Sequence, residues 1–208
     1  LTSSLELKGA NLLTPVAGTV RMLENSPAFA KTIIGGLKAR TGLTQEDANL
    51  QTFLNVFQAT LDTVDPINHA DLLGNVLFSQ INDDSVVIND GRDTLVKDTS
   101  FEVPGGEIPL SLNGSVAPLS GSENLARIAG TDPLYQDNFG MNAVGLPAFV
   151  KFFAEESVMV DGKSEVQTVG HGTPVLPANG AQTAVFTQMV AQTLSIIATD
   201  GDFAAAVN

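Results

Sequence analysis

Apolar residues recur at helical spacing in two stretches of the first third of the chain. Ser26 and Pro27 are typical of a helix start, and Gly42 is typical of a helix end, so a helix is predicted between them. Thr44 followed by Asp47 resembles a capping box and predicts the start of a longer helix, which Asp65-Pro66 would stop. The apolar face predicted for this second helix consists of Leu50, Phe53, Leu54, Phe57, Leu61 and Val64.

The rest of the chain alternates short apolar runs with polar loops. Residues 1–7 are predicted to form a short strand, followed by a turn at residues 8–11. Residues 75–81 and 148–154 are apolar runs typical of buried strands, whereas residues 86–118 are interrupted by Gly and Pro and are predicted to be loop with short strands. Residues 120–130 are predicted to form a short helix. Asn179 is predicted to cap the last helix, with Phe186, Val190, Leu194 and Ile197 on one side.

This order of elements predicts the α/β class, as the second half of a doubly wound, mostly parallel sheet. Residues 16–74 would form a helical, cap-like insertion, and residues 75–208 would supply polar loops, closing strands and a final helix. In such sheets, ligands bind at the carboxyl ends of the strands. Asp84 and His171 each follow a predicted strand, so both are expected at that edge.

Composition excludes several classes of function. The 208 residues carry a formal net charge of −13, which would repel nucleic acid and anionic lipid surfaces. Any contact with a membrane would then depend on apolar loops. The chain has no cysteine, so disulfides and thiolate chemistry are excluded. Because the sequence opens without Met and without a basic leader, we expect it to be a piece of a longer protein.

Two histidines are the candidate general bases. His171 lies between two glycines in a loop, where it could act as a base or be a solvated loop histidine; the glycines would let the loop bend closely around it. His69 follows the end of a predicted helix and is expected to be a surface or capping residue.

Asp83 and Asp84 are the candidate acids that would orient a histidine. They follow the predicted strand at residues 75–81, where a triad acid would need a rigid loop, but the same residues would also form an Asx turn. A calcium site across residues 82–93 is a further reading, although the spacing of an EF-hand loop is absent.

A nucleophilic serine is not evident in this sequence. The hydrolase elbow has the pattern Gly-x-Ser-x-Gly, and Ser115, Ser120 and Ser122 do not fit it. No phosphate-binding glycine loop or zinc motif is present either, so no cofactor and no metal is predicted. These residues alone cannot assemble a complete serine triad.

Four blocks of the chain resemble, in order, the large extracellular lipases and lysophospholipases of Gram-negative bacteria, the Pla/Cef type of the α/β-hydrolase superfamily. Residues 1–29 resemble the strand after the nucleophile helix of that family and its Ser-Pro-x-Phe segment, and residues 57–69 resemble its Asp-Pro-Ile-Asn-Tyr block. Residues 84–89 resemble its Asp-x-Val-Ile-Pro-Asn loop, and residues 169–177 resemble its histidine loop. The chain departs from the family at Asn89, which lacks a preceding Pro, and at Thr173-Pro174, which replaces a Ser-Leu pair.

The resemblance implies a carboxylic ester hydrolase, a lipase or esterase, that uses a Ser-His-Asp triad. Asp84 would be the acid, with Asp83 as the fallback, and His171 would be the base. The serine would lie upstream of Leu1, on a companion N-terminal chain, and the substrate would be an acyl ester or lipid. The protein would be secreted or lie on the outer-membrane surface of a Gram-negative bacterium.

Two questions stay open at this point. Phe29, Ile33, Ile34, Phe53 and Phe57 would line an acyl pocket in a cap or simply face the core, and the core is the favoured reading for most of them. The alternative function is a non-catalytic, secreted acidic module for binding or structure, with calcium as one ligand.

Overall fold

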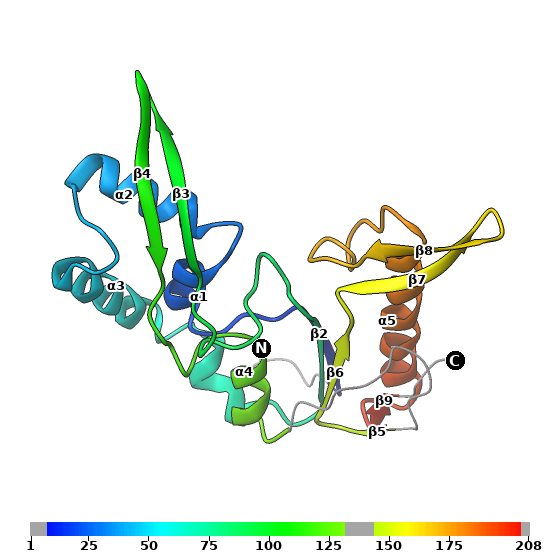
Figure 1. Ribbon diagram of the computed structural model, residues 1–208. Coiled ribbons are helices and arrows are strands. Elements are labelled where there is room, and N and C mark those ends of the chain that lie inside the picture. The colour runs from blue at the N-terminus through cyan, green and yellow to red at the C-terminus, as the bar shows by residue number, and fades with distance from the viewer. Residues whose placement is uncertain (1–7, 132–143, 205–208) are drawn as a thin grey trace. The chain divides into compact units, whose positions relative to one another are not determined.

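The computed structural model describes residues 8–131 and 144–204 and combines helices with parallel and antiparallel strands (Figure 1). The chain divides into two compact units. Unit 1 holds the described residues of 1–15, 69–84 and 126–208, and unit 2 holds residues 16–68 and 85–125. Two of the four boundaries fall within the 3-10 helix η1 (Pro66–Leu72) and the helix α4 (Ser122–Ile128), and the other two follow Pro15 and Asp84. In the described residues, no helix is long and apolar enough to cross a membrane.

Unit 1 is built on a three-stranded parallel sheet of order β1-β2-β6. The strands are β1 (Ala10–Leu13), β2 (Val76–Ile81) and β6 (Ala148–Phe152), and every residue of β2 and β6 is buried. The apolar runs that predicted β2 and β6 are therefore confirmed as buried strands, as expected where neighbours cover both faces of a parallel sheet. Residues 1–7, predicted to be a strand, lie outside the described residues. The predicted turn at residues 8–11 is wrong in part, because Ala10 and Asn11 pair with β2.

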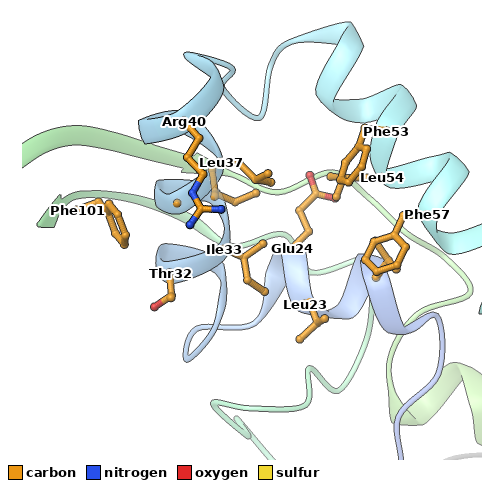
Figure 2. Close-up of a pocket in the computed structure, with 13 residues that line it drawn as sticks. Leu23, Glu24, Thr32, Ile33, Leu37, Arg40, Phe53, Leu54, Phe57 and Phe101 are labelled. Carbon is orange, nitrogen blue, oxygen red and sulfur yellow. The ribbon is translucent and has the colours of Figure 1, made fainter. Parts of the chain in front are cut away.

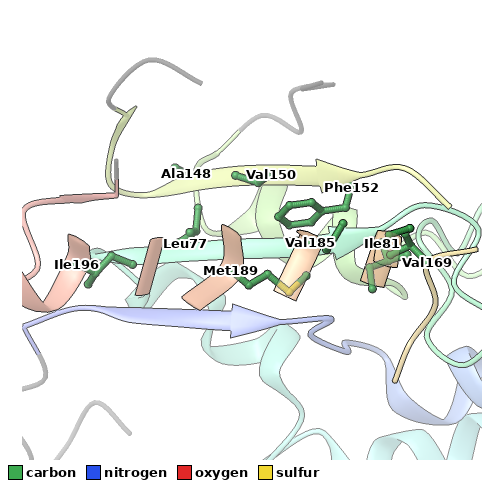
Figure 3. Packing of buried hydrophobic residues seen from close by; sticks show 10 residues of the cluster. Leu77, Ile81, Ala148, Val150, Phe152, Val169, Val185, Met189 and Ile196 are labelled. Carbon is green, nitrogen blue, oxygen red and sulfur yellow. The ribbon is translucent and has the colours of Figure 1, made fainter. Parts of the chain in front are cut away.

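The last helix, α5 (Gly180–Ala198), packs against this sheet (Figure 3). Asn179 caps it as predicted, with its side-chain oxygen accepting from the Gln182 N–H at 2.8 Å. The side predicted to carry Phe186, Val190, Leu194 and Ile197 is not the one that packs in the core, since Val190, Leu194 and Ile197 are exposed. Apolar residues occur around much of this helix, so their spacing did not show which side meets the sheet. The core of unit 1 consists of Leu77, Ile81, Ala148, Val150, Phe152, Val169, Ala181, Val185, Met189 and Ile196.

Two small antiparallel sheets complete unit 1. The strands β7 (Glu155–Val160) and β8 (Lys163–Thr168) form a hairpin that leads into the histidine loop. The strands β5 (Val144–Gly145) and β9 (Phe203–Ala204) pair over two residues each.

Unit 2 combines three helices with a long hairpin, which packs against the second of them. The helices are α1 (Thr19–Asn25), α2 (Ala30–Thr41) and α3 (Ala48–Leu61), and the hairpin strands are β3 (Val96–Val103) and β4 (Gly106–Asn113). The expectation of mere loop with short strands at residues 86–118 is therefore wrong. Both strands have eight residues, and Leu110 and Leu112 of β4 are buried in the core of the unit. Packing against α2 is close, since a Cβ at Gly35 would lie 2.4 Å from Phe101 of β3.

The helix boundaries follow the predicted signals with small offsets. Gly42 ends α2 in a left-handed conformation, as predicted. The helix begins at Ala30, because Ser26 and the next three residues form a turn first. Asp47 accepts from the Thr44 N–H at 2.6 Å, so the predicted pairing forms, but α3 starts after it at Ala48.

Asp65 follows α3 and also connects this part of the chain to α1. Its buried carboxylate accepts hydrogen bonds from the backbone N–H groups of Gly18 at 2.9 Å and Thr19 at 2.8 Å, at the start of α1. The Gln58 amide donates to the same group at 2.9 Å. Burial would raise the pKa of Asp65, but the hydrogen bonds from Thr19, Gln58, Gly18 and Ile67 outweigh it and lower the pKa. The ionised carboxylate thus fastens α1 to the chain after α3.

Replacing Asp65 with Asn should destabilise the protein by about 1–3 kcal/mol at pH 7, because the amide nitrogen cannot accept these hydrogen bonds. The folded-state pKa lies below the usual value of 3.8, so the stabilisation is complete above about pH 4 and is lost as the pH falls through the folded pKa. Urea unfolding followed by circular dichroism measures both effects. Asp71→Asn, at an exposed carboxylate, is the control, and equal effects of the two substitutions would contradict this role of Asp65.

Candidate active site

The loop after β2 places Asp84 at the carboxyl end of the parallel sheet. The Asn82 N–H donates to the Phe152 carbonyl at 2.8 Å, so the pairing with β6 continues one residue past the strand. Asp83 then turns the chain, with a left-handed φ of 53°, and is exposed. The side chain of Asp84 comes next and is 1% exposed. The turn therefore directs one aspartate to solvent and the next into the protein.

The loop after β8 holds His171 in a short hydrogen-bonded turn. The Val169 N–H donates to the Ala154 carbonyl at 2.7 Å, and Val169 itself belongs to the core of unit 1. The Thr173 N–H donates to the Gly170 carbonyl at 2.8 Å, and the Thr173 hydroxyl accepts from the Gly170 N–H at 3.2 Å. Because Thr173 is fully buried, these reciprocal bonds restrict the segment that carries the imidazole.

The structure brings Asp84 and His171 together, 87 positions apart in the chain. The distance from Asp84 Oδ2 to His171 Nδ1 is 2.8 Å, which is a hydrogen bond. An ionised carboxylate can only accept, so Nδ1 carries the proton and the second ring nitrogen, Nε2, is the acceptor in the neutral ring. The His171 side chain is 35% exposed. A buried acid therefore orients an imidazole that is still accessible, which is the arrangement a general base requires.

The surroundings of this pair differ from the expectation in two respects. His171 follows β8, which belongs to the antiparallel hairpin and not to the parallel sheet that carries Asp84. The glycines beside His171 are also not required by local geometry. Neither Gly170 nor Gly172 has a positive φ, and a Cβ at either would meet no atom within 4 Å. The fixed geometry comes from the bonds of Thr173, which the sequence marked only as a departure from the lipase family. A hydroxyl three residues after Gly170 was the available signal for this turn.

The remaining candidates from the sequence lie elsewhere. His69 is exposed on η1, as expected for a surface histidine. Ser115 and Ser120 are part of the hydrogen-bonding network of unit 2, with the Ser115 hydroxyl 3.1 Å from Glu24 Oε2 and that of Ser120 3.0 Å from the Gly18 carbonyl. Within the described residues, no hydrogen bond to Nε2 of His171 is present.

The acidic stretch at residues 82–93 does not form a cation site in the described part of the chain, where no group of three or more His, Asp or Glu side chains could hold a metal. Asp84 is paired with His171, and Asp90 forms an ion pair with Arg92. The Asn124 amide also donates to Asp90, at 3.2 Å. Burial would raise the pKa of Asp90, but the hydrogen bonds from Arg92 and Asn124 lower it to about 2. This carboxylate therefore has its positive partner within the protein.

Comparison with known proteins identifies no relative of this chain. No family model, no curated protein and no solved structure matches it. The geometry of Asp84 and His171 is accordingly the basis for inferring a function.

Proposed function

We propose that this chain supplies the acid and the base of a Ser-His-Asp triad in a carboxylic ester hydrolase, a lipase or esterase of the α/β-hydrolase type. The single observation that carries the proposal is the 2.8 Å hydrogen bond between Asp84 and His171, with the carboxylate buried and the imidazole accessible. The resemblance of residues 84–89 and 169–177 to the acid and histidine loops of Pla/Cef-type lipases supports the same assignment. This resemblance is also the only basis for proposing a location outside the cell or on the outer-membrane surface.

In the proposed reaction, a serine outside residues 1–208 attacks the carbonyl carbon of the ester. Its proton passes to Nε2 of His171, and the imidazolium then gives that proton to the departing alcohol. Water then attacks the carbonyl carbon of the acyl-enzyme while His171 accepts its proton. The imidazolium returns that proton to the serine oxygen as the acyl–serine bond breaks, which releases the acid and restores the serine. Asp84 holds the ring in the tautomer that accepts at Nε2 and stabilises the cation that forms in each half of the cycle.

The edge of the parallel sheet is a reason to expect a companion polypeptide. It has only three strands in the described residues, and β1 pairs there with β2 alone. An uncovered strand edge is a template for pairing with another chain, and all-parallel sheets are ordinarily larger and covered on both faces. We infer that the segment carrying the serine extends this sheet.

His171→Ala should lower hydrolysis of p-nitrophenyl esters at least about a thousandfold in a sample that contains the companion segment, because no base would remain to activate the serine. His69→Ala is the matched control and should leave the rate unchanged. Equal rates for His171→Ala and the unmodified protein would exclude the triad.

Asp84→Asn should lower kcat about a thousandfold or more, because the amide would donate to Nδ1 and impose the wrong tautomer on His171. Asp83→Asn should change kcat less than about threefold, since Asp83 faces solvent. Steady-state kinetics with p-nitrophenyl butyrate distinguishes the two aspartates. A larger loss with Asp83→Asn would transfer the acid role to that residue.

The companion polypeptide should be detectable in protein isolated under native conditions. Size-exclusion chromatography with native mass spectrometry should find residues 1–208 covalently or noncovalently joined to a segment that contains Gly-x-Ser-x-Gly. A lone 21.7 kDa monomer that hydrolyses esters would contradict this arrangement.

A further inference from the structure

Unit 2 contains an apolar hollow with a volume of about 530 Å³ between its three helices and β3 (Figure 2). This volume lies within the range of about 300–1,000 Å³ that is usual for small-molecule sites. All of its lining residues belong to unit 2, so the hollow is a property of that unit alone. The large apolar side chains of its lining include Leu23, Ile33, Leu37, Phe53, Phe57 and Phe101.

The helix α3 carries both buried and exposed apolar residues beside the hollow. Leu50 and Leu54 pack in the core of the unit, whereas Phe53 and Phe57 are 51% and 44% exposed. The rings of these two phenylalanines lie 6.0 Å apart, centre to centre, on the side of the helix that borders the hollow. Large apolar side chains grouped around a concave surface are typical of a binding site, whereas single exposed ones are not.

A cation completes the lining. Arg40 reaches the hollow from α2 (Figure 2), and no described residue forms an ion pair or hydrogen bond with its guanidinium. The one carboxylate in the lining, Glu24, does not compensate it. Glu24 is buried and accepts from Arg21 at 2.6 Å and from the Gln51 amide at 2.9 Å. A positive charge beside an apolar hollow therefore has no anionic partner there, in a chain whose net charge is −13.

We propose that this hollow binds a free fatty acid, with the acyl chain between α2 and α3 and the carboxylate on Arg40. A fatty acid combines one apolar chain with one anionic head. The chain would contact the apolar lining, and the carboxylate would pair with the guanidinium. An uncharged lipid would fill the hollow but leave Arg40 without a partner. The proposal concerns unit 2 and does not depend on the hydrolase chemistry of Asp84 and His171.

Displacement of a dansyl-labelled fatty acid from the full chain tests the proposal. Palmitic acid should displace the probe at micromolar concentration, and Arg40→Gln should weaken palmitic acid about tenfold, which is the loss of about 1.4 kcal/mol. Hexadecanol should bind equally to the unmodified protein and to Arg40→Gln. Lys31→Gln removes a charge from the same helix, away from the hollow, and should have no effect. No displacement, or equal effects of the two substitutions, would overturn the proposal.

A second pair of variants tests the hollow itself. Ile33→Trp should fill it and weaken both palmitic acid and hexadecanol about tenfold or more, and Phe57→Ala should weaken both without removing a core residue. Val56→Ala, on an exposed part of α3 outside the lining, is the control. Circular dichroism checks that each variant is folded. Unchanged binding in folded Ile33→Trp and Phe57→Ala would exclude this site. His171→Ala should bind palmitic acid normally. Loss of the hydrolase proposal would therefore leave the fatty-acid site unaffected, and the reverse also holds.

Discussion

The position of the candidate catalytic pair depends on the parallel pairing of β2 with β6. Both strands are fully buried, and the pairing continues through the bond from the Asn82 N–H to the Phe152 carbonyl. This leaves only Asp83 between the paired residues and Asp84, so there is little freedom in where the carboxylate lies. The histidine loop is tied to the same core through Val169, which also bonds to Ala154 two residues after β6. A rigid core thus supports both partners of a hydrogen bond that neither loop would hold alone.

Several carboxylates are buried in this chain, and their partners distinguish structural from chemical roles. Asp65 accepts from backbone and amide groups that cannot change their charge at ordinary pH, and Glu24 accepts from Arg21 and glutamine amides. These bonds offset the cost of burying a charge and fasten elements together. Of these three carboxylates, only Asp84 is paired with a histidine, and the side chain of that histidine is partly exposed. The same physical requirement, pairing of a buried charge, therefore places the candidate base next to its acid in this one case.

Unit 2 shows how one amphipathic helix can serve two purposes. Leu50 and Leu54 of α3 contribute to the core, and Phe53 and Phe57, four residues apart on the same helix, are exposed and border the hollow. The favoured prediction, that most of Phe29, Ile33, Ile34, Phe53 and Phe57 face the core, is wrong, because only Ile34 is a buried core residue. Ile34 lies in the core and also borders the hollow, whereas Phe29 is exposed and outside the lining. Burial on one side stabilises the helix, and exposure on the other leaves apolar surface for a ligand.

Local signals in the sequence determined many of the element boundaries. Gly42 ends α2 because glycine adopts the left-handed conformation readily, and Asn179 starts α5 because its side chain accepts from a free N–H of the first turn. The buried strands were recognisable as short apolar runs. These features depend on neighbouring residues only, so the sequence was enough to predict them.

Only the tertiary structure decided which faces are buried and which side chains meet. The pairing of Ala10–Leu13 with β2, the length of the β3–β4 hairpin and the buried side of α5 all depend on contacts with distant segments. The choice of Asp84 over Asp83 has the same origin, since the two neighbours are chemically identical and differ only in direction. A left-handed turn at Asp83 directs the next carboxylate toward His171, which lies 87 residues away in the sequence.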